Sequence, residues 1–188
     1  MNTQLDIVKF IKLGEIDNEL DFERALIADR KLRLLSKKDS KFKTLRIKLR
    51  RLIEAYEHKH WSAASVIDES RLLESDLAEA LAEKERQFIE RRKGLIKIKL
   101  KQLGLSQQDF GKILGHHTKS YISELINGIR PFSLKDLIVI NRLLKIDLTD
   151  LVPTFLPLTE RIKIRTSFEK LQHPKLHLDT DDFALSAS

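Results

Sequence analysis

The sequence predicts an all-α protein, and two observations support that fold class. Only six of the 188 residues are glycine and four are proline, while 34% are charged, a composition more typical of helices than of strands and turns. Apolar residues recur at three- and four-residue spacing through most of the chain, as they do along the buried face of a helix. We therefore expect an N-terminal helical hairpin, a connecting helix, a five-helix domain and a C-terminal helix.

Residues 1–67 are predicted to form an N-terminal helical region with a hairpin at about 18–60. Asp17 or Asn18 can cap the first helix of this hairpin, and a short polar break at 37–40 separates it from the second. Each helix has one apolar stripe. The two stripes comprise Ala25, Ala28, Leu32 and Leu35 in the first helix and Phe42, Leu45, Leu49, Leu52 and Tyr56 in the second.

An acidic connecting helix is predicted at 68–93, after a linker at 62–65. Residues 68–90 contain eight acids against three bases, a pattern that predicts an acidic amphipathic helix. We expect this helix to break near Gly94. The apolar residues expected on one side of it are Leu73, Leu77, Leu81 and Phe88.

The five-helix domain is predicted at 94–156. Strict alternation at 95–100 is compatible with a strand, but the pattern continues to Gly104, which favours a first helix. Ser133 can cap the fourth helix, and a short fifth one starts at 149–151. The second and third helices carry the most informative part of the chain.

Residues 104–131 predict two short helices joined by a tight turn. Ser106 can cap the first helix and Gly115 can end it in the left-handed conformation, while Thr118 can cap the second helix and Gly128 can end it. The apolar anchors are Phe110, Ile113, Leu114, Ile122, Leu125 and Ile126. The residues expected to face outward are Lys119, Ser120, Tyr121, Ser123 and Glu124. A short capped helix held across another suits insertion into a major groove, so we predict a helix-turn-helix.

The net charge of +7 is unevenly distributed along the chain. Residues 1–88 carry a net charge of +1, residues 89–172 carry +8, and residues 173–188 carry −2. The basic excess therefore lies on the predicted helix-turn-helix and on the C-terminal helix predicted at 157–172, before an acidic tail at 173–188 that we expect to be flexible. Residues 30–51 add eleven bases against one acid, which favours a solvated face over a nucleic-acid site but leaves both open.

The motif LSQQDFGKILG…YISELINGIRPFSLKDL, within residues 105–137, resembles the Xre/Cro type of helix-turn-helix found in lambdoid phage repressors. More narrowly, it is similar to the HigA antitoxins, and residues 51–61 resemble the end of the N-terminal region in longer HigA-like proteins. The resemblance implies a lambda-repressor-like domain at 94–156. It also implies a type II antitoxin that neutralises a cognate ribonuclease-type toxin and represses its own operon.

The resemblance implies DNA-binding roles for six residues. Gln107 would bind a backbone phosphate from the start of its helix, and Arg130 would hold the flanking phosphate. The residues that would reach base edges or phosphates are Lys119, Ser120, Tyr121 and Ser123. For Ser123 the alternative is a purely structural role, in which it only caps or bridges helices. Glu124 stands where many relatives have a basic or neutral residue. An acid there would repel phosphate or accept a hydrogen bond from a cytosine amine.

The expected partners are double-stranded operator DNA, a HigB-like toxin protein and a second copy of the chain. Toxins of this kind tend to be basic, as the resemblance implies, so the acidic helix is the candidate contact, through Glu74, Asp76, Glu79 and Glu83. Two other functions stay open: a plain transcriptional repressor without a toxin, and a protein-interaction module with a non-DNA-binding Xre fold.

Several chemistries find no support in the sequence. There is no Gly-rich phosphate loop, no GxSxG or HExxH motif and no cysteine, so we expect neither an enzyme, nor a cofactor, nor a metal site. The histidine pairs His58/His60 and His116/His117 are expected to be turn or surface residues. No run of about 18 apolar residues occurs, and the N-terminus is a poor signal peptide, which together predict a cytoplasmic protein. The resemblance to the HigA antitoxins implies a bacterial one.

Overall fold

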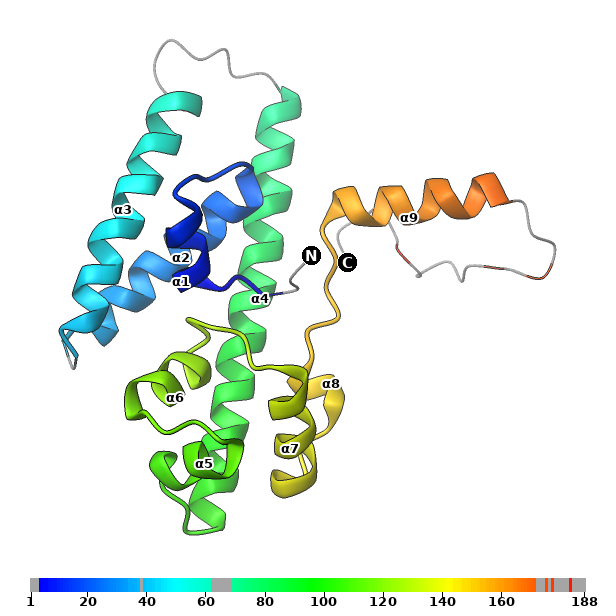
Figure 1. Cartoon of the computed structure of the whole chain (residues 1–188). Helices are drawn as coiled ribbons and strands as arrows, with labels where there is room; N and C mark the ends of the chain where they lie inside the picture. Colours follow the sequence, from blue (N-terminus) through cyan, green and yellow to red (C-terminus); the bar gives the residue numbers. More distant parts are fainter. Residues whose placement is uncertain are drawn as a thin grey trace. The chain divides into compact units, whose positions relative to one another are not determined.

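The computed structural model describes residues 4–37, 39–61 and 69–171 together with Lys175, His177 and Phe183. These residues form an all-helical fold (Figure 1), as the sequence predicts. The chain divides into two compact units, Met1–Pro153 and Thr154–Ser188. The helices are α1 (Ile7–Leu13), α2 (Glu19–Leu35), α3 (Lys41–His60), α4 (Glu69–Gln102), α5 (Gln107–Leu114), α6 (Lys119–Ile126), α7 (Leu134–Leu144), α8 (Leu148–Leu151) and α9 (Leu158–Leu171).

The predicted N-terminal hairpin is confirmed as α2 and α3. Asn18 rather than Asp17 caps α2, because its side-chain oxygen accepts from the Asp21 backbone amide at 2.9 Å. The two apolar stripes face each other in a common core, in which Leu32 and Leu49 are fully buried. The linker predicted at 62–65 lies outside the described residues.

A single helix, α4, replaces the two helices predicted on either side of Gly94. It runs for 34 residues without interruption and packs against α2 as well as against α7 and α8 (Figure 1). Gly94 adopts ordinary helical geometry with open space where a Cβ would stand. A glycine inside a helix costs only about 1 kcal/mol relative to alanine, which is not enough to end a long, well-packed helix.

The buried face of the first half of α4 differs from the predicted leucine stripe. Leu73 is 59% exposed, whereas Ala78 and Ala82 are buried. The partner helix α2 also contributes small buried residues, Ala25 and Ala28. Ala28 of α2 and Ala82 of α4 line the same small pocket, so alanines rather than the predicted leucines are the buried apolar residues on this part of α4.

A helix absent from the sequence prediction, α1, joins the N-terminal region to the loop after α6. Its first residue, Ile7, donates a backbone hydrogen bond to the Ile129 carbonyl at 2.9 Å. The Asp6 side chain caps α1, and Gly14 ends it in the left-handed conformation. Asp6, Gly14 and the apolar spacing between them are the local signals that could have revealed this helix.

The five predicted helices of residues 94–156 are present, with the end of α4 as the first and α5 to α8 as the others. Ser133 caps α7 through a capping box with Asp136. The core of this group is contiguous and comprises Ile96, Leu100, Phe110, Leu114, Ile122, Leu125, Ile126, Phe132, Leu137, Ile140, Leu144, Ile146 and Leu151.

The second unit contains α9, which corresponds to the helix predicted at 157–172. None of its residues is buried, and Lys163 pairs with Glu160 at 3.0 Å along its surface. Most of the tail predicted at 173–188 lies outside the described residues.

Candidate nucleic-acid interface

Ser106, Gly115 and Thr118 cap the α5–α6 pair as the sequence predicts, whereas the C-cap of α6 is Asn127, followed by Gly128 with φ 69°. The Ser106 hydroxyl accepts from the Asp109 backbone amide at 3.1 Å, and the Asp109 carboxylate accepts from the Ser106 amide in return. This hydrogen bonding, first of all from the Ser106 side chain, lowers the pKa of Asp109 below its ordinary value. Gly115 ends α5 with φ 83°, and Thr118 caps α6 by accepting from the Tyr121 amide at 3.3 Å. Both helix ends are therefore fixed locally.

Helix α6 crosses α5 at close range because Gly111 has no side chain. A Cβ at this position would lie 2.6 Å from Cγ1 of Ile122 and 3.0 Å from the His116 carbonyl oxygen. Ile113, predicted on the buried face, is 46% exposed and is therefore not an anchor. The anchors that the structure confirms are Phe110, Leu114, Ile122, Leu125 and Ile126.

The predicted DNA contacts on α6 differ in accessibility. Lys119 is exposed at the first position of the helix and forms no ion pair with any residue that the structure describes. Ser120 and Tyr121 are partly buried. Ser123 accepts from the Asn127 side-chain amide, at 2.8 Å on its carbonyl oxygen and 3.3 Å on its hydroxyl. Lys119 is thus the most accessible of the four, and their roles in DNA binding stay predictions.

Glu124 does not face outward, so that prediction is wrong. Its side chain is fully buried, and its two carboxylate oxygens accept from Lys41 Nζ at 2.5 Å and from Arg130 Nε at 2.6 Å. The charge that would have repelled phosphate is balanced by two cations. Helical periodicity within α6 could not reveal this, because Lys41 is 83 residues away in the sequence.

Arg130, predicted to hold a flanking phosphate, is anchored from three directions. Besides Glu124, its guanidinium lies over the Tyr121 ring at 5.4 Å from the ring centroid, and Nη1 is 4.0 Å from the Asp6 carboxylate. These contacts hold a partly exposed cation directly after α6.

Two lysines that sequence reasoning missed stand beside Gln107. Lys97 and Lys101 lie four residues apart on one face of α4, and they line an open recess of about 380 Å³ together with Ser106 and Gln107. The predicted phosphate contact of Gln107 therefore has two cations next to it. The only sequence signal for them was the net basic charge of this part of the chain.

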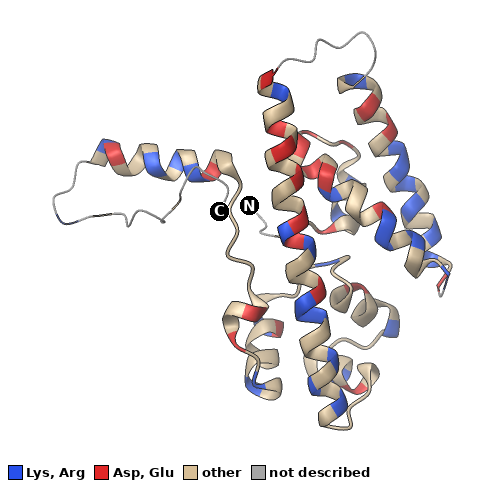
Figure 2. Ribbon diagram, turned by 180° about the vertical axis from the view of Figure 1, so that it is seen from behind, with Lys and Arg blue, Asp and Glu red and all other residues tan. Residues whose placement is uncertain are grey.

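The four acids predicted to contact a protein partner lie on the first half of α4, where red predominates in Figure 2. Asp76, Glu79 and Glu83 share one side of the helix at three- and four-residue spacing, but Glu74 does not. Hydrogen bonds from Arg86, and then from Gln87, lower the pKa of Glu83 to about 2. Glu83 is thus already paired within α4, whereas Glu74, Asp76 and Glu79 are exposed.

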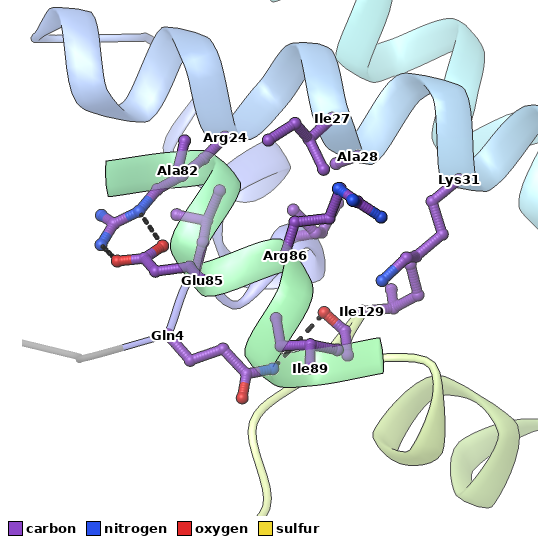
Figure 3. A pocket seen from close by; sticks show the side chains of 13 residues that line it. Gln4, Arg24, Ile27, Ala28, Lys31, Ala82, Glu85, Arg86, Ile89 and Ile129 are labelled. Carbon is purple, nitrogen blue, oxygen red and sulfur yellow. Dashed lines mark hydrogen bonds and ion pairs between the residues drawn. The ribbon is translucent and has the colours of Figure 1, made fainter. Parts of the chain in front are cut away.

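A small pocket lies between α1, α2, α4 and the loop after α6 (Figure 3). Its volume is about 50 Å³, far below the several hundred Å³ of typical ligand pockets. Its most prominent charges are already paired, because Arg24 donates two hydrogen bonds to Glu85, at 2.8 and 2.5 Å. Gln4 closes one side through the Gly128 carbonyl at 3.4 Å. We interpret this pocket as a packing gap rather than as a binding site.

The arrangement of α4 to α8, with two capped short helices in tight contact, can be compared with known families. Residues 96–151 match the helix-turn-helix family, in its Xre/Cro type. The match indicates a DNA-binding transcription regulator whose ligand is double-stranded DNA. Comparisons with curated proteins and with solved structures found no match.

The matched region extends from the last turns of α4 to α8 and includes the α5–α6 pair. That α6 is the recognition helix of this pair stays a prediction. Among the residues that the structure describes, no helix is long and apolar enough to cross a membrane. The same residues contain no group of three or more His, Asp or Glu side chains that could hold a metal ion.

Proposed function

We propose that this protein is a transcriptional repressor that reads its own operator as a homodimer through α6. The observation that carries the proposal is the exposed Lys119 at the first position of a recognition helix whose apolar face is fully buried. In helix-turn-helix domains this end of the helix enters the major groove. Lys97 and Lys101 support the proposal, because they place two further cations beside Gln107 at the start of α5.

The direct test is fluorescence anisotropy on the duplex just upstream of this protein's gene, over a salt series. We expect tight, salt-sensitive binding by the wild type and at least tenfold weaker binding by Lys119→Ala/Ser120→Ala. Lys12→Ala, an exposed lysine on α1, is the control and should bind like the wild type. Equal affinity of the wild type for this duplex and for a scrambled one would contradict operator reading.

Homodimerisation is part of this proposal, since operators of this class have two half-sites about 34 Å apart. Sedimentation of the complex should give two protein chains per operator duplex. A strictly monomeric complex on a full-length operator would contradict the dimer.

We further propose that the same chain is an antitoxin, with the first third of α4 as its toxin contact. Two exposed leucines, Leu72 and Leu73, stand beside the exposed acids there and are 48% and 59% exposed. A surface that combines negative charge with accessible apolar groups is suited to a basic protein partner. The partner would be the ribonuclease toxin encoded beside this gene.

Charge reversal tests this second proposal. The variant Glu74→Lys/Asp76→Lys/Glu79→Lys leaves the internal pair of Glu83 intact and should weaken toxin binding at least tenfold. The control, Glu54→Lys/Glu57→Lys, changes exposed acids on α3 and should bind normally. Unchanged toxin affinity in the α4 variant would exclude this contact. If no toxin gene lies beside this gene and expression of the protein does not rescue growth, the remaining proposal is a transcriptional repressor without a toxin partner.

A further inference from the structure

Lys41, the first residue of α3, lies against the recognition helix although it belongs to the N-terminal hairpin. Its ammonium donates to Glu124 at 2.5 Å and to the Ser120 hydroxyl at 3.3 Å. Ser120 and Glu124 are four residues apart and therefore share one face of α6. The α3 cation is thus held beside the recognition-helix side chain for which we predict a DNA contact.

The geometry keeps Lys41 available to a ligand. Its side chain is 52% exposed, whereas Glu124 beneath it is fully buried. An ammonium group has three donors, and two of them are used by Glu124 and Ser120, which leaves one N–H for a further acceptor. A phosphate oxygen bound by Ser120 would lie within reach of this N–H.

The basic surface continues from Lys41 along α3. Lys48 is two helical turns further on the same side, about 10.5 Å away along the axis, and Arg51 follows three residues later. Both are exposed, and neither forms an ion pair with the part of the chain that the structure describes. We call Lys41, Lys48 and Arg51 the α3 basic stripe; Figure 2 shows the blue residues along this helix.

The sign of this charge distinguishes two roles for the hairpin. A segment that covers a DNA-reading face in competition with DNA should present acids, because it replaces phosphates. The hairpin tip does the reverse: residues 30–51 hold eleven bases and one acid. Residues 30–51 thus carry positive charge, as a DNA-binding surface does. This charge favours a hairpin that contributes to DNA binding over one that covers α6 and competes with DNA.

We infer that the α3 basic stripe is a second DNA-contact element, which binds backbone phosphates beside the groove read by α6. Lys41 is its first contact, and Glu124 is a positioning residue that holds Lys41 and Arg130 next to the recognition helix. Lys48 and Arg51 reach successive phosphates. This inference rests on the proposed operator binding and extends the interface beyond the helix-turn-helix domain.

Anisotropy titrations with the upstream duplex test the inference at about 50 and 200 mM salt. Each lost phosphate contact reduces the salt slope by about 0.9, so the advantage of the wild type over Lys41→Gln should shrink about 3.5-fold over this range. The variant Lys48→Gln/Arg51→Gln leaves Glu124 paired and removes two phosphate contacts. The affinity advantage of the wild type over this variant should shrink about 12-fold over the same salt range. Lys41→Arg should restore most of the lost binding.

The matched control is Lys43→Gln/Arg50→Gln, which removes two exposed cations seven residues apart on the side of α3 opposite Lys41 and Lys48. It should keep the salt slope of the wild type. Tighter binding by Lys41→Gln would instead identify the hairpin as a cover and overturn the inference. An unchanged slope in Lys48→Gln/Arg51→Gln would overturn it as well, while operator binding lost in Lys119→Ala would still support the proposed function. A wild type that does not distinguish operator from scrambled duplex would overturn both.

Discussion

At the scale of single residues, a buried guanidinium joins three segments of the first unit. Arg92 on α4 is 3% exposed and donates to the Leu151 carbonyl at 3.0 Å and to the Gln4 side-chain oxygen at 2.7 Å. The rings of Phe88 and Phe132 lie 5.6 and 5.3 Å from the guanidinium carbon. Burial lowers the pKa of Arg92 to about 10. Carbonyl dipoles and aromatic faces therefore stabilise this charge.

Arg92→Ala should destabilise the fold strongly. It creates a cavity and leaves two buried acceptors, on Leu151 and Gln4, without a donor, which together cost about 3–5 kcal/mol. Urea denaturation measures this loss. Arg92→Lys keeps a cation that lacks the guanidinium fork, so it should recover only part of the stability. A variant within about 0.5 kcal/mol of the wild type would contradict the structural role of Arg92.

Tyr56 makes stability depend on alkaline pH. Burial, and then a hydrogen bond to Glu19 at 2.9 Å, raises the pKa of Tyr56 above its ordinary value of 10.0. In the unfolded chain this tyrosine ionises near 10, whereas in the fold it stays protonated. The stabilisation is therefore complete below pH 10 and decreases as the pH rises above it, by about 1.4 kcal/mol per pH unit.

The comparison of wild type with Tyr56→Phe isolates this effect. Between about pH 9 and pH 11 the urea midpoint of the wild type should fall more steeply than that of Tyr56→Phe. Tyr121→Phe, the same change at the other tyrosine of the chain, is the control for tyrosine removal in general. If the urea midpoints of wild type and Tyr56→Phe fell in parallel with pH, Tyr56 would not be the source of the alkaline loss of stability.

At the scale of helices, two glycines predict opposite results for the same substitution. Gly94→Ala should stabilise the fold by about 0.5–1 kcal/mol, because Gly94 is helical and a Cβ there meets no atom within 4 Å. Gly111→Ala should destabilise it by about 1–3 kcal/mol, because its Cβ would lie 2.6 Å from Ile122. Thermal denaturation of the two variants checks both signs. A stabilised Gly111→Ala would show that α5 and α6 have room to separate.

The elements that the sequence predicted well are those with local signals. Capping residues such as Ser106, Thr118 and Ser133 act within one turn, and apolar periodicity acts within one helix, so both are readable from adjacent residues. The α2–α3 hairpin and the α5–α6 pair follow from them.

The elements that the sequence did not predict depend on distant partners. The continuity of α4 through Gly94 depends on packing along its whole length. Ala78 and Ala82 are buried because α4 packs against α2, a helix more than 30 residues away in the sequence. In the candidate site, periodicity places Glu124 on the outward side, which is wrong, because its two cationic partners come from outside α6 and bury it.

At the scale of the whole first unit, the hairpin and the helix-turn-helix domain should unfold together. The chain from Met1 to Pro153 is one compact unit, and Ile129 of the loop after α6 is buried in the core of the hairpin. The single tryptophan, Trp61, packs against that core and reports on it by fluorescence. Amide hydrogen exchange at Leu114 reports on the helix-turn-helix core.

Both probes should therefore give the same urea midpoint. Two separated transitions would show that the hairpin and the helix-turn-helix domain unfold independently. In that case the Lys41→Gln variant, which removes a contact between them, should not increase the difference between the two midpoints. Coincident transitions in the wild type are the expected result.

The continuity of α4 has a thermodynamic consequence for regulation. The helix is about 51 Å long, with Ala82 in the contact with α2 and Ile96 in the core of the helix-turn-helix domain. If a protein bound to its first turns changes the DNA affinity of α6 by some factor, DNA must change the affinity for that protein by the same factor. A measurement of either effect, that of the bound protein on DNA affinity or that of DNA on the affinity for the protein, therefore gives the other. The sign of the coupling decides whether the bound protein strengthens repression or releases it.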